Sequence, residues 1–140
     1  MNNSKQTNSP ILVGVYGSLR EGLSNHKILG NSKLVGTFQT LPEFSMYDLG
    51  SYPAIINKGN TSISVEVYEV TENTLEKLDC LEGYYSFNSA TNHYNRRKID
   101  SPYGEIYVYL YNDVLENLNL QKIVESGDWK DYHETKHLTY

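Results

Sequence analysis

The chain has few cysteines, few basic residues and no long apolar run, and each of these excludes or disfavours a class of protein. It holds one cysteine, Cys80, so no disulfide can form within it. Only 12 lysines and arginines stand against 17 aspartates and glutamates, giving a formal net charge of -5. This balance disfavours a surface that follows nucleic-acid phosphates, and no apolar run approaches the roughly 20 residues that span a bilayer. We therefore expect a cytoplasmic protein with no nucleic-acid partner and no membrane partner.

Phenylalanine and tryptophan are also scarce, with 3 copies and 1 copy, whereas tyrosine occurs 13 times. Tyrosine combines apolar area with a polar tip, which suits the surface of an amphipathic sheet and also strands that line a small-molecule pocket. A length of 140 residues fits a single domain around one core. The sequence predicts a disordered polar leader over residues 1–10 and one domain over residues 11–140.

Apolar and alternating runs predict five or six short strands, mainly antiparallel. The segments with strand character are residues 11–16, 33–40, 43–48, 63–70, 94–100 and 105–111, with a shorter apolar run at 54–56. The second and third segments are either two strands or one bent hairpin around Leu41-Pro42.

Helical signals are fewer. Thr71 is a candidate N-cap for a helix that ends at Glu82, with Gly83 as its stop and three leucines on one face: Leu75, Leu78 and Leu81. A shorter helix is expected from Ser24, as N-cap, to Leu29, with Gly30 as a left-handed terminator, and a weak helix over residues 114–125.

These elements define an α+β domain. Strands of this number and length usually curl or close to protect their edges. We therefore expect a small mixed, mostly antiparallel β-barrel with two to three short flanking helices.

The first strand ends in the loop Tyr16-Gly17-Ser18-Leu19, just before a helical segment. A buried strand that ends in Gly-Ser leaves several backbone N–H groups unpaired in one place. Such a concavity suits a carboxylate, a phosphate or a developing oxyanion. Ser18 has no recognisable His/Asp partners, so the loop does not indicate a serine hydrolase.

Glu82 is the acid whose position stands out. It occupies the last turn of a helix, at the negative end of the helix dipole, and the aromatic pair Tyr84-Tyr85 follows it. Both effects would raise the pKa of the carboxyl, as suits a general acid/base. From position alone, a solvated glutamate beside a C-cap glycine explains the pattern as well.

Several short motifs, in this order, resemble the γ-glutamylcyclotransferase-like family, in particular its small AIG2-like members. The resemblance extends from Val13 to Asp131. The chain departs from the usual family pattern between Gly83 and Tyr94, where the spacing is longer and the expected proline is missing. The motifs are Tyr16-Gly17-Ser18-Leu19, Leu78-Asp79-Cys80-Leu81-Glu82-Gly83-Tyr84, Tyr94-Asn95-Arg96-Arg97, Pro102-Tyr103-Gly104 and Ser126-Gly127-Asp128-Trp129.

The resemblance implies an enzyme that cyclises a γ-glutamyl amine or γ-glutamyl amino acid to 5-oxoproline and releases the free amine. Glu82 would be the catalytic acid/base, and the backbone of Tyr16, Gly17, Ser18 and Leu19 would cradle the γ-glutamyl substrate. Tyr94 and Arg96 would also contact substrate. The reaction needs no metal and no cofactor, and we expect a monomer or a weak homodimer.

Two other functions fit the same residues. A non-catalytic protein could keep the cradle and sequester a small molecule, and a barrel surface rich in tyrosine could bind another protein. The remaining reactive side chains predict little: Cys80 is expected to be a buried or half-buried thiol. The four histidines are too scattered for a metal site: His26, His93, His133 and His137.

Overall fold

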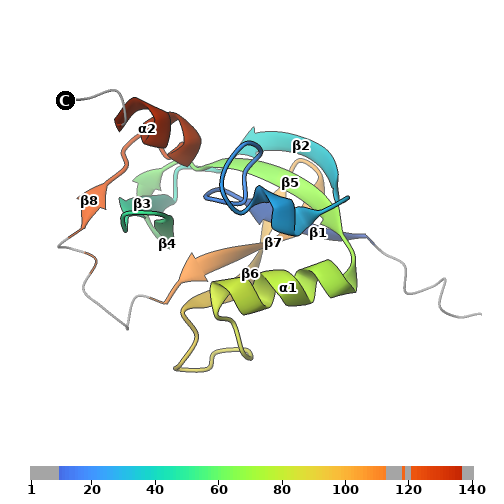
Figure 1. The fold of residues 1–140 in the computed structure, drawn as a ribbon. Helices are drawn as coiled ribbons and strands as arrows, with labels where there is room; N and C mark the ends of the chain where they lie inside the picture. Colours follow the sequence, from blue (N-terminus) through green and yellow to red (C-terminus); the bar gives the residue numbers. More distant parts are fainter. Residues whose placement is uncertain (1–9, 113–117, 119–120, 137–140) are drawn as a thin grey trace, which may run out of the picture.

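The computed structural model describes residues 10–112, 118 and 121–136 (Figure 1). The predicted leader falls almost wholly outside these residues. Within them the chain forms eight strands, two α-helices and one 3-10 helix. Their bounds, in chain order, are β1 Ile11–Val15, η2 His26–Leu29, β2 Lys33–Gln39, β3 Phe44–Asp48, β4 Pro53–Thr61, β5 Ser64–Val70, α1 Glu72–Glu82, β6 Tyr94–Ser101, β7 Gly104–Tyr111, β8 Lys122–Ile123 and α2 Trp129–Lys136.

The strands form two sheets. The larger has the order β2-β5-β1-β7-β6, and the smaller has the order β4-β3-β8. β1 pairs parallel with β7, and the other pairings are antiparallel, so the larger sheet is mixed. β1 lies at its centre, which explains why the first strand is apolar without alternation.

The larger sheet curls without closing, so the predicted closed barrel is not observed. Its edge strands are β2 and β6. Tyr103, in the turn between β6 and β7, reaches across to β2, and its hydroxyl donates to the carbonyl of Thr37 at 2.8 Å. In a closed barrel, backbone hydrogen bonds would join the two edge strands. Here a side chain makes the connection instead. The α+β class and the mixed, mostly antiparallel pairing are as predicted.

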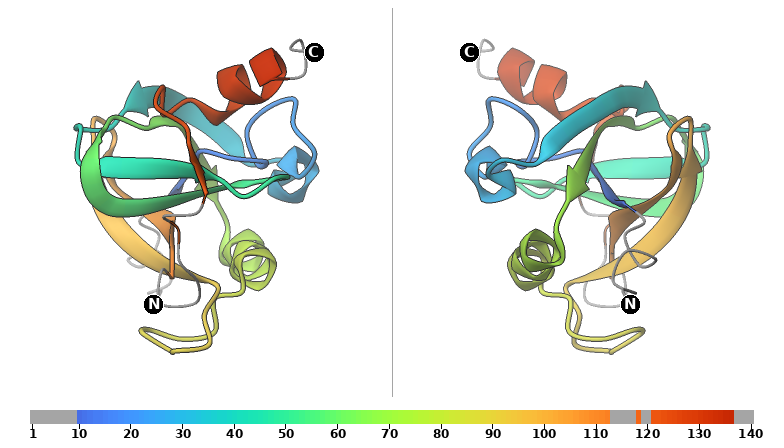
Figure 2. Two further views of the ribbon diagram at one scale, coloured as in Figure 1. Left: turned by 90° about the vertical axis from the view of Figure 1, so that its left-hand side faces the viewer. Right: turned by 90° about the vertical axis from the view of Figure 1, so that its right-hand side faces the viewer.

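Apolar side chains cover both faces of the larger sheet. One cluster, which contains Val13 and Val15 from β1, includes Leu78 of α1. The other includes Val65 and Val67 of β5 together with Trp129 of α2, which is 1% exposed. Figure 2 shows α1 end-on and α2 at the opposite end of the molecule. Through the buried Trp129, α2 packs onto the body of the domain.

Helix α1 forms as predicted. The hydroxyl oxygen of Thr71 accepts a hydrogen bond from the backbone N–H of Thr74 at 3.1 Å, which caps the first turn. Gly83 adopts a left-handed conformation with φ 66°, and its N–H bonds back to the last turn. A side chain at Gly83 would also approach Cβ of His93 to 2.9 Å. The C-terminal turn, which carries Glu82, is thus fixed in place.

Other local predictions were wrong. The segment after the loop is the single 3-10 turn η2, whose N-cap is Asn25 and not Ser24, and Gly30 has φ 56° and ψ -121°, outside the left-handed helical region. Residues 122–123, predicted as helical, form β8, and most of the remaining predicted 114–125 helix lies outside the described residues. The apolar run at 54–56 is the start of the nine-residue strand β4, which pairs with β3.

Candidate active site

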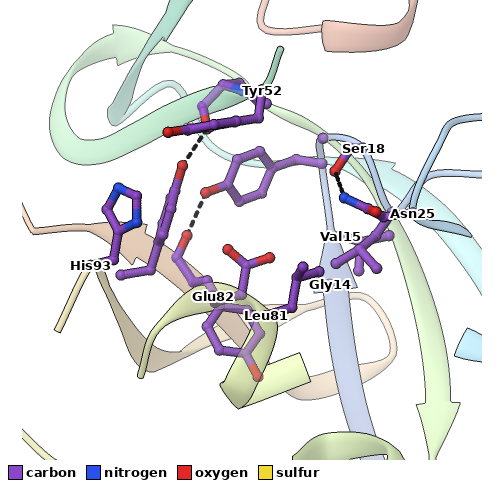
Figure 3. A pocket seen from close by; sticks show the side chains of 14 residues that line it. Gly14, Val15, Ser18, Asn25, Tyr52, Leu81, Glu82 and His93 are labelled. Atoms are coloured by element: carbon purple, nitrogen blue, oxygen red, sulfur yellow. Dashed lines mark hydrogen bonds between the residues drawn. The ribbon is translucent and has the colours of Figure 1, made fainter. Parts of the chain in front are cut away.

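A cavity of about 190 Å³ opens where the loop after β1 meets the C-terminus of α1 and the starts of β4 and β6 (Figure 3). The carboxyl group of Glu82 points into it. Four of the tyrosines contribute to its wall, so part of the tyrosine excess does line a pocket. The lining residues are Gly14, Val15, Tyr16, Gly17, Ser18, Leu19, Asn25, Tyr52, Pro53, Leu81, Glu82, His93, Tyr94 and Tyr109.

The loop after β1 is held from behind through its carbonyl groups and one side chain. The Ser18 carbonyl accepts from the backbone N–H of Asn25 at 2.9 Å, and the Ser18 hydroxyl accepts from the Asn25 side-chain amide at 2.8 Å. The Leu19 carbonyl lies 2.9 Å from Nδ1 of His26. These bonds turn the acceptors of the loop toward the protein.

The donors of the same loop remain available. The backbone N–H groups of Gly17, Ser18 and Leu19 bond to no acceptor among the described residues. All three residues line the cavity. The carbonyls of Gly17, Ser18 and Leu19 are all engaged, so these three residues present only donors to the cavity, an arrangement that suits an anionic or developing negative oxygen.

Gly17 is required for a close contact that builds the cavity wall. A Cβ atom at this position would lie 2.8 Å from Cδ of Pro53, too close for van der Waals contact. The Pro53 carbonyl accepts a hydrogen bond from the hydroxyl of Tyr94 at 2.8 Å. The loop, the start of β4 and the start of β6 are thus packed as one unit.

The side chain of Glu82 is half-buried at the cavity and has no charge partner among the described residues. Burial raises the pKa of its carboxyl from the usual 4.5 to about 7, and no ion pair or hydrogen bond to a described residue opposes this shift. The group can therefore both accept and release a proton near neutral pH. The sequence analysis predicted this raised pKa of Glu82, but it assigned the shielding of the carboxyl to the wrong aromatic residues.

The aromatic pair that follows Glu82 does not shield it. Tyr85 is 73% exposed and Tyr84 is half-buried, and neither lines the cavity. The aromatic rings around the carboxyl come instead from distant strands and loops. They belong to Tyr16, Tyr94 and Tyr109.

The tyrosine hydroxyls of the cavity are used as donors to the protein. The Tyr16 hydroxyl donates to the backbone carbonyl of Tyr109, and the Tyr94 hydroxyl donates to Pro53. Burial, followed in each case by neighbouring acidic groups including Glu82, raises the pKa of Tyr16 and Tyr94 above the usual 10.0. Both phenols therefore stay protonated at neutral pH and fix the cavity wall.

Arg96 is not brought to the cavity. Its guanidinium pairs with the carboxylate of Asp79 on α1 and lies 4.9 Å and 4.6 Å from the ring centres of Tyr84 and Tyr107. Asp79 also accepts from the hydroxyl of Tyr109 at 2.6 Å. Arg96 thus anchors α1 and one tyrosine of the wall from outside. The structure does bring Tyr16, Gly17, Ser18, Leu19, Glu82 and Tyr94 together.

The loop is also anchored by an ionic network that sequence reasoning missed. Nε of Arg20 lies 3.1 Å from Glu66 of β5, and a terminal nitrogen lies 2.8 Å from Asp128. Glu66 accepts in addition from the backbone N–H of Glu21 and from the hydroxyl of Tyr68, at 2.9 and 3.0 Å. β5 carries two acids, the buried Glu66 and the exposed Glu69, so no local signal distinguished the one that pairs.

No metal site was found among the described residues, where no group of three or more His, Cys, Asp or Glu side chains converges. His137 lies outside those residues.

Cys80 is exposed, contrary to the expectation of a buried or half-buried thiol. No helix in the described part of the chain is long and apolar enough to cross a bilayer.

The buried carboxyl has a consequence for stability. Glu82 binds its proton more tightly in the folded than in the unfolded chain, so its contribution to stability is complete below about pH 4.5 and is lost as the pH rises through about 7. Glutamine has no such proton. Because one pKa unit corresponds to about 1.4 kcal/mol, the unfolding free energy of Glu82→Gln relative to wild type is expected to rise by about 3 kcal/mol from acid pH to pH 8. Denaturant unfolding across pH measures this, and a pH-independent difference would contradict burial of the charge.

Comparisons with known proteins agree on one family. The family model described as "Gamma-glutamyl cyclotransferase, AIG2-like" matches residues 13–131. A candidate γ-glutamylcyclotransferase of Vibrio cholerae is 43% identical over 118 residues, which are 84% of this chain and 94% of that protein.

The name of a second relative includes a substrate. The γ-L-glutamyl-butirosin B γ-glutamyl cyclotransferase of Niallia circulans is 33% identical over 125 residues, 84% of this chain and 74% of that protein. Among solved structures, the solution NMR structure of YtfP from Escherichia coli superimposes with a TM-score of 0.65 at 33% identity, covering 88% of this chain and 99% of that one.

Proposed function

Because the chain belongs to the AIG2-like γ-glutamyl cyclotransferase family, we propose that it cyclises a γ-glutamyl amide to 5-oxoproline and releases the free amine, with Glu82 as the general acid/base. The observation that supports this most is the half-buried carboxyl of Glu82, which has no partner among the described residues and shares the cavity with backbone N–H donors that are likewise unpaired among those residues. The Niallia circulans relative, named for γ-L-glutamyl-butirosin B, supports the choice of substrate class.

The substrate carries its own nucleophile. The α-amine attacks the γ-carbonyl carbon to close a five-membered ring, and the bond from that carbon to the leaving nitrogen breaks. Because both reacting groups belong to one molecule, the enzyme need only hold the chain in a folded conformation. The enzyme's remaining tasks are proton transfer and charge stabilisation.

Glu82 performs the proton transfer. Its carboxylate takes a proton from the α-ammonium group, which frees the amine for attack, and the resulting carboxylic acid gives that proton to the leaving nitrogen. The regenerated carboxylate then takes the second proton that the attacking nitrogen loses as the lactam forms, and the released amine takes up this proton. A pKa of about 7 matches both steps, since neither form of the group is strongly disfavoured at neutral pH. The tyrosines around it keep water from the carboxyl.

The loop N–H groups perform the charge stabilisation. Gly17, Ser18 and Leu19 offer donors that can hold the α-carboxylate of the substrate or the oxyanion that forms on the γ-carbonyl oxygen. Tyr94 lines the opposite wall and restricts the γ-glutamyl chain to a bent conformation. Arg96 supports this wall through Asp79 and Tyr109.

Release of 5-oxoproline tests the proposal. Purified wild-type protein is incubated with a panel of γ-glutamyl amides, and 5-oxoproline and free amine are quantified by chromatography. We expect equal molar amounts of both products from at least one amide. Saturable binding of the amides without any product would contradict the proposal and favour the alternative of a sequestering protein on the same fold.

A further inference from the structure

The mouth of the cavity is apolar. Among the lining residues, Leu81 and Tyr52 are the large apolar side chains that reach solvent, at 41% and 38% exposed. The half-buried His93 also lines the cavity, and its ring centre lies 6.2 Å from that of Tyr52. Figure 3 shows these side chains around the carboxyl of Glu82. We define Leu81, Tyr52 and His93 as the mouth wall.

The mouth wall is held in position. The His93 ring packs against Tyr94 and Tyr111 at centre distances of 5.0 and 5.5 Å, in addition to Tyr52. Its backbone N–H donates to the carbonyl of Gly83 at 2.9 Å, which ties it to the end of α1. A ring fixed in this way is an apolar surface that needs little reordering when a ligand packs on it.

The mouth offers no lysine or arginine to a ligand, and His93 is its one side chain that can take up a positive charge. None of the lining residues is lysine or arginine. Arg96 follows soon after His93 in the sequence, but its guanidinium is paired with Asp79 and stacked on two tyrosine rings outside the cavity. A carboxylate at the mouth would therefore lose hydration beside Leu81 without gaining a permanent cation as its partner.

The two polar ends of the γ-glutamyl group use the inner parts of the cavity, at Glu82 and the loop N–H donors. The leaving group then extends past the mouth wall to solvent. We propose that the preferred leaving group is an uncharged apolar or aromatic amine, and that Leu81, Tyr52 and His93 select it over an amino acid. This inference rests on the proposed cyclotransferase function and assigns its substrate class.

Three matched substrates test the inference. γ-Glutamylphenethylamide and γ-glutamylphenylalanine share the same ring and differ by one carboxylate, and γ-glutamylmethylamide lacks the ring. We expect kcat/KM for the phenethylamide to exceed that for each of the other two by about tenfold or more. Equal or faster turnover of γ-glutamylphenylalanine would overturn the inference while leaving the cyclotransferase function intact. No 5-oxoproline from any of the three would overturn both.

A charge added to the mouth provides a second test. In Leu81→Arg we expect kcat/KM to rise for γ-glutamylphenylalanine and to fall for the phenethylamide, because the guanidinium can pair with the carboxylate and removes apolar surface. Cys80→Arg is the matched control, since Cys80 is exposed on the same helix and does not line the cavity. An unchanged substrate ratio in Leu81→Arg, or the same change in both variants, would contradict the role of the mouth wall.

Discussion

Replacement of Glu82 by glutamine is expected to lower kcat for 5-oxoproline release by about 10²–10⁴-fold, the usual contribution of a positioned acid/base. Glutamine keeps the shape of the side chain and removes its ability to exchange a proton. Since the wild-type carboxyl makes no ion pair or hydrogen bond with a described residue, the exchange breaks no interaction that holds the fold. The loss should therefore appear in kcat, with little change in KM.

The control for this variant lies on the same helix. Glu76 is an exposed acid of α1, and Glu76→Gln changes the net charge by the same amount. Its turnover should equal that of the wild type. Unfolding curves of both variants verify that they are folded at the assay temperature. If Glu82→Gln retained wild-type turnover, the proton transfer would have to be assigned to another group.

Replacement of Arg20 by methionine is expected to lower the unfolding free energy by about 3–5 kcal/mol. Arg20 and Glu66 have side chains only 12% and 9% exposed, so the variant leaves a carboxylate buried without its cation. The hydrogen bond from the backbone N–H of Glu21 to Glu66 remains and keeps that carboxylate in place. Denaturant unfolding at neutral pH measures the effect.

Two further variants separate burial from charge in this network. Lys98→Met removes one partner of the exposed pair with Glu105, at 3.9 Å, and should cost less than about 1 kcal/mol. Adding Glu66→Gln to Arg20→Met removes the unpaired charge, keeps an acceptor for Glu21 and Tyr68, and should restore much of the lost stability. A loss for Arg20→Met no larger than that for Lys98→Met would show that Glu66 is solvated and not buried.

The parts of the site that sequence predicted are the parts encoded locally. Thr71, the leucines and Gly83 define α1 within thirteen residues, and they place Glu82 at its end. Strand β1 and its Gly-Ser break likewise occupy one short stretch. Signals of this kind depend on helix capping and on hydrophobic periodicity, which neighbouring residues suffice to produce.

What the sequence did not predict depends on contacts between distant residues. Arg20 pairs with Glu66 and Asp128, which lie 46 and 108 positions further along the chain. The two edges of the larger sheet are linked by Tyr103 and the carbonyl of Thr37, 66 positions apart, and strand count does not reveal this contact. The shielding of Glu82 was assigned to the adjacent tyrosines, because tyrosines from other strands cannot be placed without the fold.

The pH dependence of 5-oxoproline release tests the assignment of Glu82 most directly. The carboxylate must be ionised to take the proton of the α-ammonium group, and its ionised fraction rises with pH through its pKa of about 7. The assay is run on the preferred γ-glutamyl amide from about pH 5 to about pH 9, with wild type and with Glu82→Gln. We predict that kcat/KM of the wild type rises with an apparent pKa near 7 and that this rise is absent from the residual activity of the variant. A flat wild-type profile, or the same rise in Glu82→Gln, would contradict the account.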